Sequence, residues 1–171
     1  LIIYKDRDST SNWRVIPAFI NDGHYLELNS TAAIVTGSTS YFGANTSSVL
    51  GISGSNSGII NANNNDIIAY CFAPSEICSV GKYTGNGSAD GPFVFTGMRP
   101  RWIMFKRTDS TNNWFILDTV RNSFNALTDY LSADTSSAEA TAANIADALS
   151  NGFKVRGGST YYGFNASGGT Y

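Results

Sequence analysis

The chain has 171 residues, which suffices for one ordinary domain or two small ones with a hydrophobic core. Only 14% of the residues are charged, and no apolar run approaches the roughly 20 residues that cross a bilayer, so we expect no membrane insertion. The net charge of −2 excludes electrostatic capture of nucleic acid or anionic lipid as the main activity. Many small polar residues, 17 glycines and 13% aromatics favour an extracellular or virion β-protein.

Short apolar or alternating runs between turn signals predict strands along the whole chain. In chain order the predicted strands are 1–4, 12–16, 67–72, 79–84, 91–96, 102–106, 113–117 and 152–156. The Asp-Ser-Thr-x-Asn turns after the first and sixth of these predict hairpins, and Asn151-Gly152 is a strong turn signal before the last.

Residues 136–149 are the one helical possibility, because the segment is rich in alanine and carries Glu139 near its start. Its apolar stripe of Ala142, Ile145 and Leu149 is thin, so a short helix and a non-helical segment both stay open. No helices alternate with strands, which argues against a doubly wound fold. The predicted class is all-β, an antiparallel β-sandwich of the jelly-roll or concanavalin-like kind.

An internal repeat is the most informative pattern in the sequence. Residues 4–15 align with residues 105–116 at an offset of 101, with Lys, Asp, Ser, Thr, Asn and Trp matching in place. Two weaker matches follow, Tyr25-Leu26 with Tyr130-Leu131 and Asn61-Ala62 with Asn165-Ala166. The pattern predicts a tandem repeat of about 100 residues, a period that suits a string of β-sandwiches.

The two predicted repeats, 1–73 and 74–171, are each incomplete at a different edge. The first lacks a counterpart of the segment 79–100, and the second stops where a counterpart of strand 67–72 is expected. We therefore expect either a piece of a longer polypeptide or completion by strand addition from a neighbour.

No residue pattern predicts catalysis or a metal site. His24 is the only histidine and has no marked nucleophile beside it, so we interpret it as a plain loop residue. The chain has three glutamates with no visible pairing, which disfavours a glycosidase. No calcium-loop pattern occurs, and Asp8 and Asp109 are predicted to cap turns. We expect no enzyme activity, cofactor or metal.

Tryptophans are the remaining candidate binding residues. Trp13 and Trp114 occupy equivalent repeat positions, and Trp102 follows a basic segment. Each is either a core residue or a stacking platform for a sugar ring, with Asn113 and Asp109 beside Trp114 as polar partners. Cys71 and Cys78 could form a disulfide or remain free thiols, and the sequence leaves both open.

Residues 80–109, Asn113-Trp114, 149–156 and 165–171 carry a long sequence motif. It resembles a lectin-like repeat of roughly 100 residues in virion structural and tail-fibre proteins of tailed phages, often marine ones. Residues 68–73 resemble that family's terminal strand. The resemblance implies a concanavalin-like fold and a structural role, and it supplies no catalytic motif.

These observations predict a non-enzymatic structural module of a phage virion, tail fibre or surface fibre. Its expected partners are copies of itself or other virion proteins, in the virion or outside the cell. A carbohydrate-binding module for host surface glycan is the first alternative. A subunit of an extracellular filament joined by strand exchange is the second.

Overall fold

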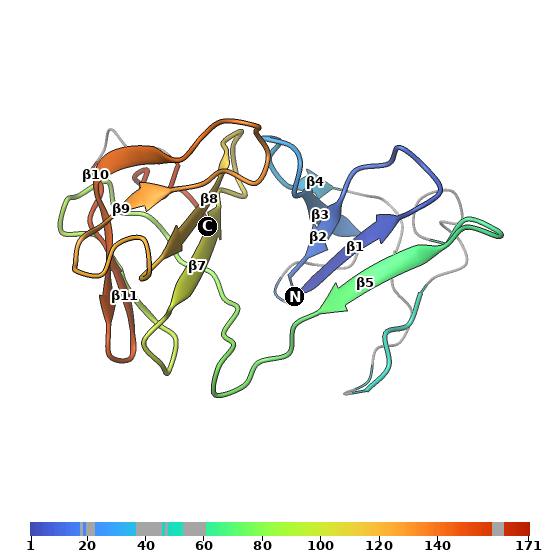
Figure 1. The fold of residues 1–171 in the computed structure, drawn as a ribbon, viewed down its shortest axis with the longest axis horizontal. Helices are drawn as coiled ribbons and strands as arrows, with labels where there is room; N and C mark the ends of the chain where they lie inside the picture. The colour runs from blue at the N-terminus through green and yellow to red at the C-terminus, as the bar shows by residue number, and fades with distance from the viewer. Residues whose placement is uncertain (18, 20–22, 37–45, 47, 53–60, 159–162) are drawn as a thin grey trace. The chain divides into compact units, whose positions relative to one another are not determined.

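All regular structure in the described part of the chain is β-strand, and every strand pairing is antiparallel (Figure 1). The structure is a computed structural model that describes residues 1–17, 19, 23–36, 46, 48–52, 61–158 and 163–171. The prediction of an all-β, antiparallel protein is confirmed. The chain divides into two compact units, Leu1–Leu28 with Ile34–Phe72 and Asn29–Ala33 with Ala73–Tyr171.

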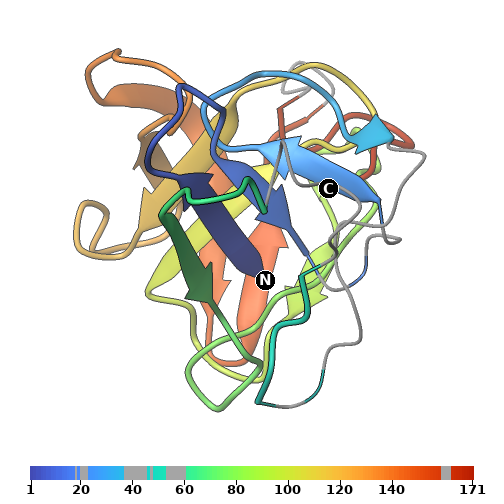
Figure 2. The same ribbon diagram turned by 90° about the vertical axis from the view of Figure 1, so that its right-hand side faces the viewer.

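The first unit contains one five-stranded sheet, ordered β4-β3-β2-β1-β5 (Figure 2). Its strands are β1 (Ile2–Asp6), β2 (Arg14–Ile16), β3 (His24–Glu27), β4 (Val35–Thr36) and β5 (Ile67–Cys71). Tyr4 and Tyr25 form a small core on which Ile16, Val35 and Ile67 pack. Arg14 lies over the Tyr25 ring, with its Cζ 4.0 Å from the ring centroid, a cation–π arrangement.

The second unit contains a four-stranded sheet, ordered β6-β11-β10-β9, and a two-stranded sheet, β7-β8. Its strands are β6 (Phe93–Phe95), β7 (Trp102–Lys106), β8 (Trp114–Asp118), β9 (Leu127–Tyr130), β10 (Ala140–Leu149) and β11 (Gly152–Val155). The pairing of β10 with β9 shifts register between Thr141 and Ala146. Asn144 lies in that interval with φ of 49°, a left-handed conformation that asparagine tolerates better than most residues.

The core of the second unit draws on both of its sheets. Ile103, Phe105 and Leu117 come from β7 and β8, whereas Ile145 and Phe153 come from β10 and β11. The Phe105 and Phe153 rings meet edge to face, with centroids 5.3 Å apart, which aromatic quadrupoles favour. Apolar burial in this shared core stabilises the unit.

The hairpins β1–β2 and β7–β8 share one register. Ile2 pairs with Ile16 and Ile3 with Val15, while Ile103 pairs with Leu117 and Met104 with Ile116, each position shifted by 101. The pairing with the next segment of the chain also corresponds. Val15 of β2 pairs with Leu26 of β3, and the equivalent Ile116 of β8 forms a bridge with Leu131.

A lysine closes the turn of each hairpin. Lys5 Nζ donates to the carbonyls of Asp6 and Ser9, the latter at 2.8 Å. Its counterpart Lys106 is 5% exposed and donates to the carbonyls of Thr31, Arg107 and Asn112 at 3.1, 3.0 and 2.9 Å. Burial lowers the pKa of Lys106 to about 8, and the Asp134 carboxylate opposes that shift. These ammonium groups bind carbonyls of their own turns, and Lys106 also binds the Thr31 carbonyl, which accepts the backbone N–H of Asn112 as well.

Most predicted strands are present, with short changes at their ends. Strands 1–4, 67–72, 102–106 and 152–156 are confirmed as β1, β5, β7 and β11, and 12–16, 91–96 and 113–117 as β2, β6 and β8. The strand at 79–84 is wrong: only Thr84 forms a bridge, to Thr170.

Two further expectations are corrected. The helical alternative for 136–149 is wrong, because Ala140–Leu149 forms β10, where pairing with β9 and β11 overrides the helix propensity of alanine. His24 lies in β3, opposite Thr36, rather than in a loop. Short strands such as β3, β4 and β9 escaped prediction because their identity depends on the neighbours that pair with them.

We predict that Leu117→Ala destabilises the second unit by about 2–5 kcal/mol, because Leu117 is 0% exposed and its removal leaves a cavity between the two sheets. Chemical denaturation followed by tryptophan fluorescence measures the change. Val120→Ala is the matched control, since Val120 is 62% exposed and its truncation is expected to change the unfolding free energy by less than about 0.5 kcal/mol. Equal effects of the two substitutions would contradict the assignment of the core.

Candidate functional site

The structure separates the three candidate tryptophans by exposure. Trp114 is 3% exposed and belongs to the interior of the second unit, where its backbone N–H donates to Asp134 Oδ1 at 3.0 Å. Trp13 is half-buried and stacks on Tyr70, with ring centroids 6.4 Å apart and planes at 27°. Trp102 is 55% exposed. Trp102 therefore offers the largest free aromatic surface among the three.

Trp102 lies beside a carboxylate because of strand register. It is directly opposite Asp118 at the open end of the β7–β8 hairpin. Directly opposed residues of an antiparallel pair project from the same face of the sheet with Cβ atoms about 4.5–5.5 Å apart. The indole and the carboxylate are thus neighbours on the surface of the second unit.

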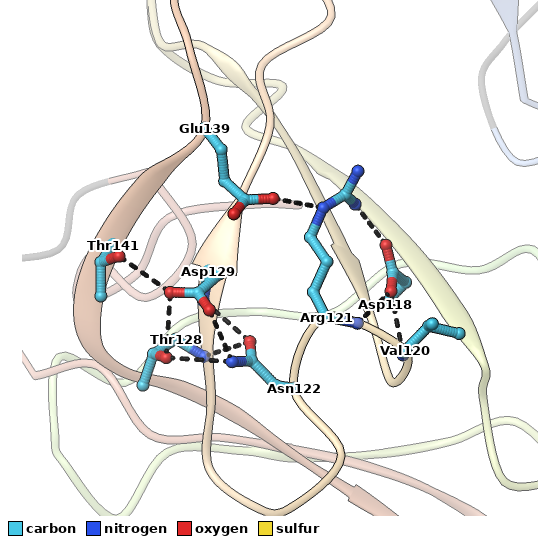
Figure 3. Close-up of polar contacts among 8 residues, drawn as sticks. All are labelled: Asp118, Val120, Arg121, Asn122, Thr128, Asp129, Glu139 and Thr141. Carbon is cyan, nitrogen blue, oxygen red and sulfur yellow. Dashed lines mark hydrogen bonds and ion pairs between the residues drawn. The ribbon is translucent and has the colours of Figure 1, made fainter.

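Asp118 organises the loop that follows β8 (Figure 3). Its Oδ1 accepts the backbone N–H groups of Val120 and Arg121, at 2.9 and 2.8 Å. Its Oδ2 pairs with the Arg121 guanidinium, which also pairs through Nε with Glu139. Arg121 therefore bridges two carboxylates, one at the end of β8 and one just before β10, as Figure 3 shows.

A second set of polar contacts continues from this loop to β9 and β10. Asn122 Oδ1 accepts the backbone N–H groups of Thr128 and Asp129, at 2.9 and 2.8 Å. Asn122 Nδ2 donates to Asp129 Oδ2 at 2.8 Å, and Thr141 Oγ1 donates to Asp129 Oδ1 at 2.8 Å. The Asn122 side chain thereby closes the loop against β9 without a regular backbone ladder (Figure 3).

Hydrogen bonding keeps the two aspartates of this network ionised. The pKa of Asp118 is lowered mainly by the N–H of Arg121, with Val120 and the nearby guanidinium groups of Arg121 and Arg101 adding to the effect. The pKa of Asp129 is lowered chiefly by Thr141 and Asn122. Donors aimed at a carboxylate favour its charged form. At neutral pH the surface presents fixed negative oxygens around one guanidinium.

The arrangement is suited to binding rather than to proton transfer. Asp118 and Asp129 have donors already in contact and depressed pKa values, which is the opposite of a general acid poised near neutral pH. An exposed indole next to fixed charged and amide groups can stack on an apolar ring face and exchange hydrogen bonds with hydroxyl groups at its rim.

The other candidate residues lie at the turn end of the same hairpin. Asp109 pairs with Arg107, with Oδ1 2.8 Å from Nε, and this pair lowers the pKa of its carboxyl. The Asn113 backbone N–H donates to Asn112 Oδ1 at 3.0 Å. Trp102 is at the opposite end, so the structure does not bring Asp109 and Asn113 to its ring.

The expected turn cap in the first hairpin is corrected from Asp8 to Asp6. Asp6 Oδ1 accepts the backbone N–H of Asp8 at 2.9 Å, and its Oδ2 accepts Asn65 Nδ2 at 2.8 Å. Asp8 Oδ2 instead accepts the N–H of Asp66, next to β5. Sequence spacing alone did not reveal this contact across 58 positions.

Both cysteines are free thiols, Cys71 exposed and Cys78 partly buried. Within the described residues, no three His, Cys, Asp or Glu side chains cluster so as to hold a metal ion. The same part of the chain has no helix with the length and hydrophobicity that a membrane crossing needs.

The fold defines an all-β protein of antiparallel sheets. A family model described as a domain of unknown function, DUF7483, matches residues 1–171, so the chain belongs to that family. No curated protein and no solved structure matches the chain.

Sequence reasoning found Trp102 and missed the polar network beside it. At the 101-position offset of the predicted repeat, Asp118 and Arg121 align with Pro17 and Ile20. That difference between the two aligned segments is the sequence signal for this network. The contacts with Glu139 and Thr141 had no sequence signal, since they depend on how β10 pairs with β9.

We predict that acid weakens the second unit through these aspartates. A lowered folded-state pKa means that the unfolded chain binds protons first, so the stabilisation is present above about pH 4 and is lost as pH falls through the folded-state pKa. Asp118→Asn keeps an oxygen for the two backbone donors and should show a shallower decline of unfolding free energy between pH 4 and 2. Urea titrations across that range measure it, with Val120→Ala as the control in the same loop. A variant slope as steep as the parent's would refute the assignment.

Proposed function

We propose that the protein is a non-enzymatic structural module of a phage virion, tail fibre or other surface fibre, built from tandem β-sandwich repeats. The observation that carries the proposal is the common register of β1–β2–β3 and of β7–β8 with Leu131, displaced by 101 and 105 positions. Two units with the same strand pairing support a repeated module, and repeated β-modules suit elongated assemblies.

Two further observations support this proposal. The core of the second unit combines residues of two sheets, which supports the sandwich part of the proposal. Low charge and abundant small polar residues suit an extracellular surface. Residues 80–109 and 165–171 resemble repeats of tailed-phage structural proteins. This resemblance is the reason for proposing that the protein is part of a virion.

The proposal predicts self-association. Light scattering coupled to size exclusion should give a defined oligomer well above the 18.3 kDa of one chain, and electron microscopy should show a repetitive particle. A high-salt run is the control, because strand pairing and apolar contacts persist where weak charge contacts dissociate. A monodisperse monomer at every accessible concentration would count against an assembly module.

A second candidate function is glycan binding on the surface formed by Trp102, Asp118 and Arg121. The observation that favours it is the 55% exposure of Trp102 directly across the hairpin from Asp118. An aromatic face flanked by fixed polar groups suits a pyranose ring. This role is compatible with a fibre, since a fibre that carries such a surface could attach to host glycan.

We predict that Trp102→Ala abolishes glycan binding while the fold persists, because an exposed side chain contributes little to the core. A printed array of bacterial surface oligosaccharides identifies a bound glycan, and calorimetry then compares variants, with an expected loss of at least about 10-fold. Phe124→Ala is the matched control, because Phe124 is 86% exposed and lies outside the network. An array without any bound glycan, or equal affinity of the two variants, would remove this candidate.

A further inference from the structure

An exposed arginine stands next to the exposed indole of Trp102. Arg101 directly precedes Trp102, and both residues are exposed. The Arg101 carbonyl accepts the backbone N–H of Thr119 at 3.0 Å, which extends the β7–β8 hairpin by one pair beyond Trp102 and Asp118. Pro100, on the other side of Arg101, is buried. The backbone of Arg101 is therefore fixed by the fold, and its side chain starts from a defined point on the surface.

The Arg101 guanidinium is near enough to Asp118 to act on it through its charge. The pKa of Asp118 is lowered first by the N–H of Arg121, and the positive charge of Arg101 lowers it further. Asp118 is directly opposite Trp102 across the hairpin, so the two side chains project from the same face. The indole, the Asp118 carboxylate and the Arg101 guanidinium thus belong to one surface.

The two arginines near Asp118 differ in how far their donors are used. Arg121 pairs with Asp118 and, through Nε, with Glu139. The side chain of Arg101 makes no hydrogen bond or ion pair to any residue that the structure describes. Its guanidinium therefore keeps five N–H donors for a ligand, in a planar fork that matches the two oxygens of a carboxylate.

The charges beside the indole favour an anionic ligand. Of the acidic groups in the network, Asp118 is the one opposite Trp102, and Arg121 already pairs with it. Glu139 and Asp129 lie on the other side of Arg121 from Asp118 (Figure 3). Arg101 therefore adds a positive charge next to the indole that no ion pair within the described ranges offsets. This local excess attracts an anion even though the whole chain carries a net charge of −2.

Asp118 itself has little capacity left for a ligand. A carboxylate offers about four lone-pair positions. Its Oδ1 accepts the backbone N–H groups of Val120 and Arg121, and its Oδ2 pairs with the Arg121 guanidinium. About one position remains on Oδ2, which is enough for one sugar hydroxyl. The main polar anchor for a ligand is therefore Arg101, and its natural partner is an anionic oxygen group.

We propose that the surface formed by Arg101, Trp102 and Asp118 binds a uronic acid residue of an acidic polysaccharide. The apolar face of the pyranose ring stacks on the indole, the carboxylate accepts hydrogen bonds from Arg101, and one ring hydroxyl donates to Asp118. A uronic acid suits this surface because its carboxylate is carried at the rim of the ring that stacks. The inference rests on the glycan-binding candidate proposed above and names its class of ligand.

Matched pairs of oligosaccharides test the role of the carboxylate on the full chain. The probes are oligogalacturonate, oligomannuronate and oligoguluronate, each compared with its carboxyl-reduced form. Reduction turns each carboxylate into a primary alcohol and leaves the ring, the linkage and the length unchanged. Calorimetry measures the affinities. We expect the oligouronate that binds best to lose at least about 10-fold in affinity on reduction, because its charged hydrogen bonds to Arg101 are lost.

Substitutions assign the effect to Arg101. Arg101→Gln should weaken binding of the oligouronate by about 10-fold or more and change binding of the reduced form by less than about 3-fold. Arg101→Lys keeps the charge without the planar fork, so its affinity should lie between those of the parent and Arg101→Gln. Lys82→Gln is the matched control, because it removes one positive charge from an exposed residue outside this surface, with an expected change below about 3-fold. An unchanged Tm shows that each variant keeps its fold.

The outcomes distinguish this inference from the glycan-binding candidate on which it rests. Equal affinity for an oligouronate and its reduced form, or equal losses with Arg101→Gln and Lys82→Gln, would overturn the uronic acid assignment and leave glycan binding standing. A sulfated galactan oligosaccharide that binds as tightly as the best oligouronate would also overturn it, since the surface would then attract anions in general. Binding of neutral glycans alone has the same consequence. A chain that binds none of these probes and no glycan on the array removes both the inference and the candidate function.

Discussion

Backbone hydrogen bonding is the constraint on which this structure depends. In the described residues no helix satisfies N–H and C=O groups locally, so each buried group needs a partner from another strand, a side chain or a turn. Strand pairing satisfies most of them, and buried polar side chains satisfy others. Lys106 saturates three carbonyls near the β7–β8 turn, and the buried Asn165 donates to the carbonyls of Ser88 and Gly157 at 2.7 and 2.5 Å.

The same constraint explains where small residues are required. A Cβ added at Gly152 would lie 2.2 Å from the Val94 carbonyl oxygen, and one at Gly85 would lie 2.3 Å from the Ala166 carbonyl oxygen. Gly152 lets β11 approach β6, and Gly85 lets the loop pair with the segment at Asn165. Polar loops are thereby held to the core by backbone contact, which suits a chain with few charged side chains.

Trp102 supports the glycan-binding candidate through its side chain. Its indole stands beside Asp118 on the sheet surface and would stack on a sugar ring. Side chain and backbone point in perpendicular directions in a strand, so an indole exposed on the sheet surface does not interfere with the pairing of β7 with β8.

The sequence by itself determined the all-β class, the two hairpins, and the match between residues 4–15 and residues 105–116. These depend on local patterns, namely alternation, turn residues and a repeated motif. Only the tertiary structure decided that Trp114 is buried while Trp102 is exposed, that Ala140–Leu149 is a strand, and that Arg121 joins Asp118 to Glu139. Those outcomes depend on which strands pair and which face each sheet buries, and contacts between distant segments set both.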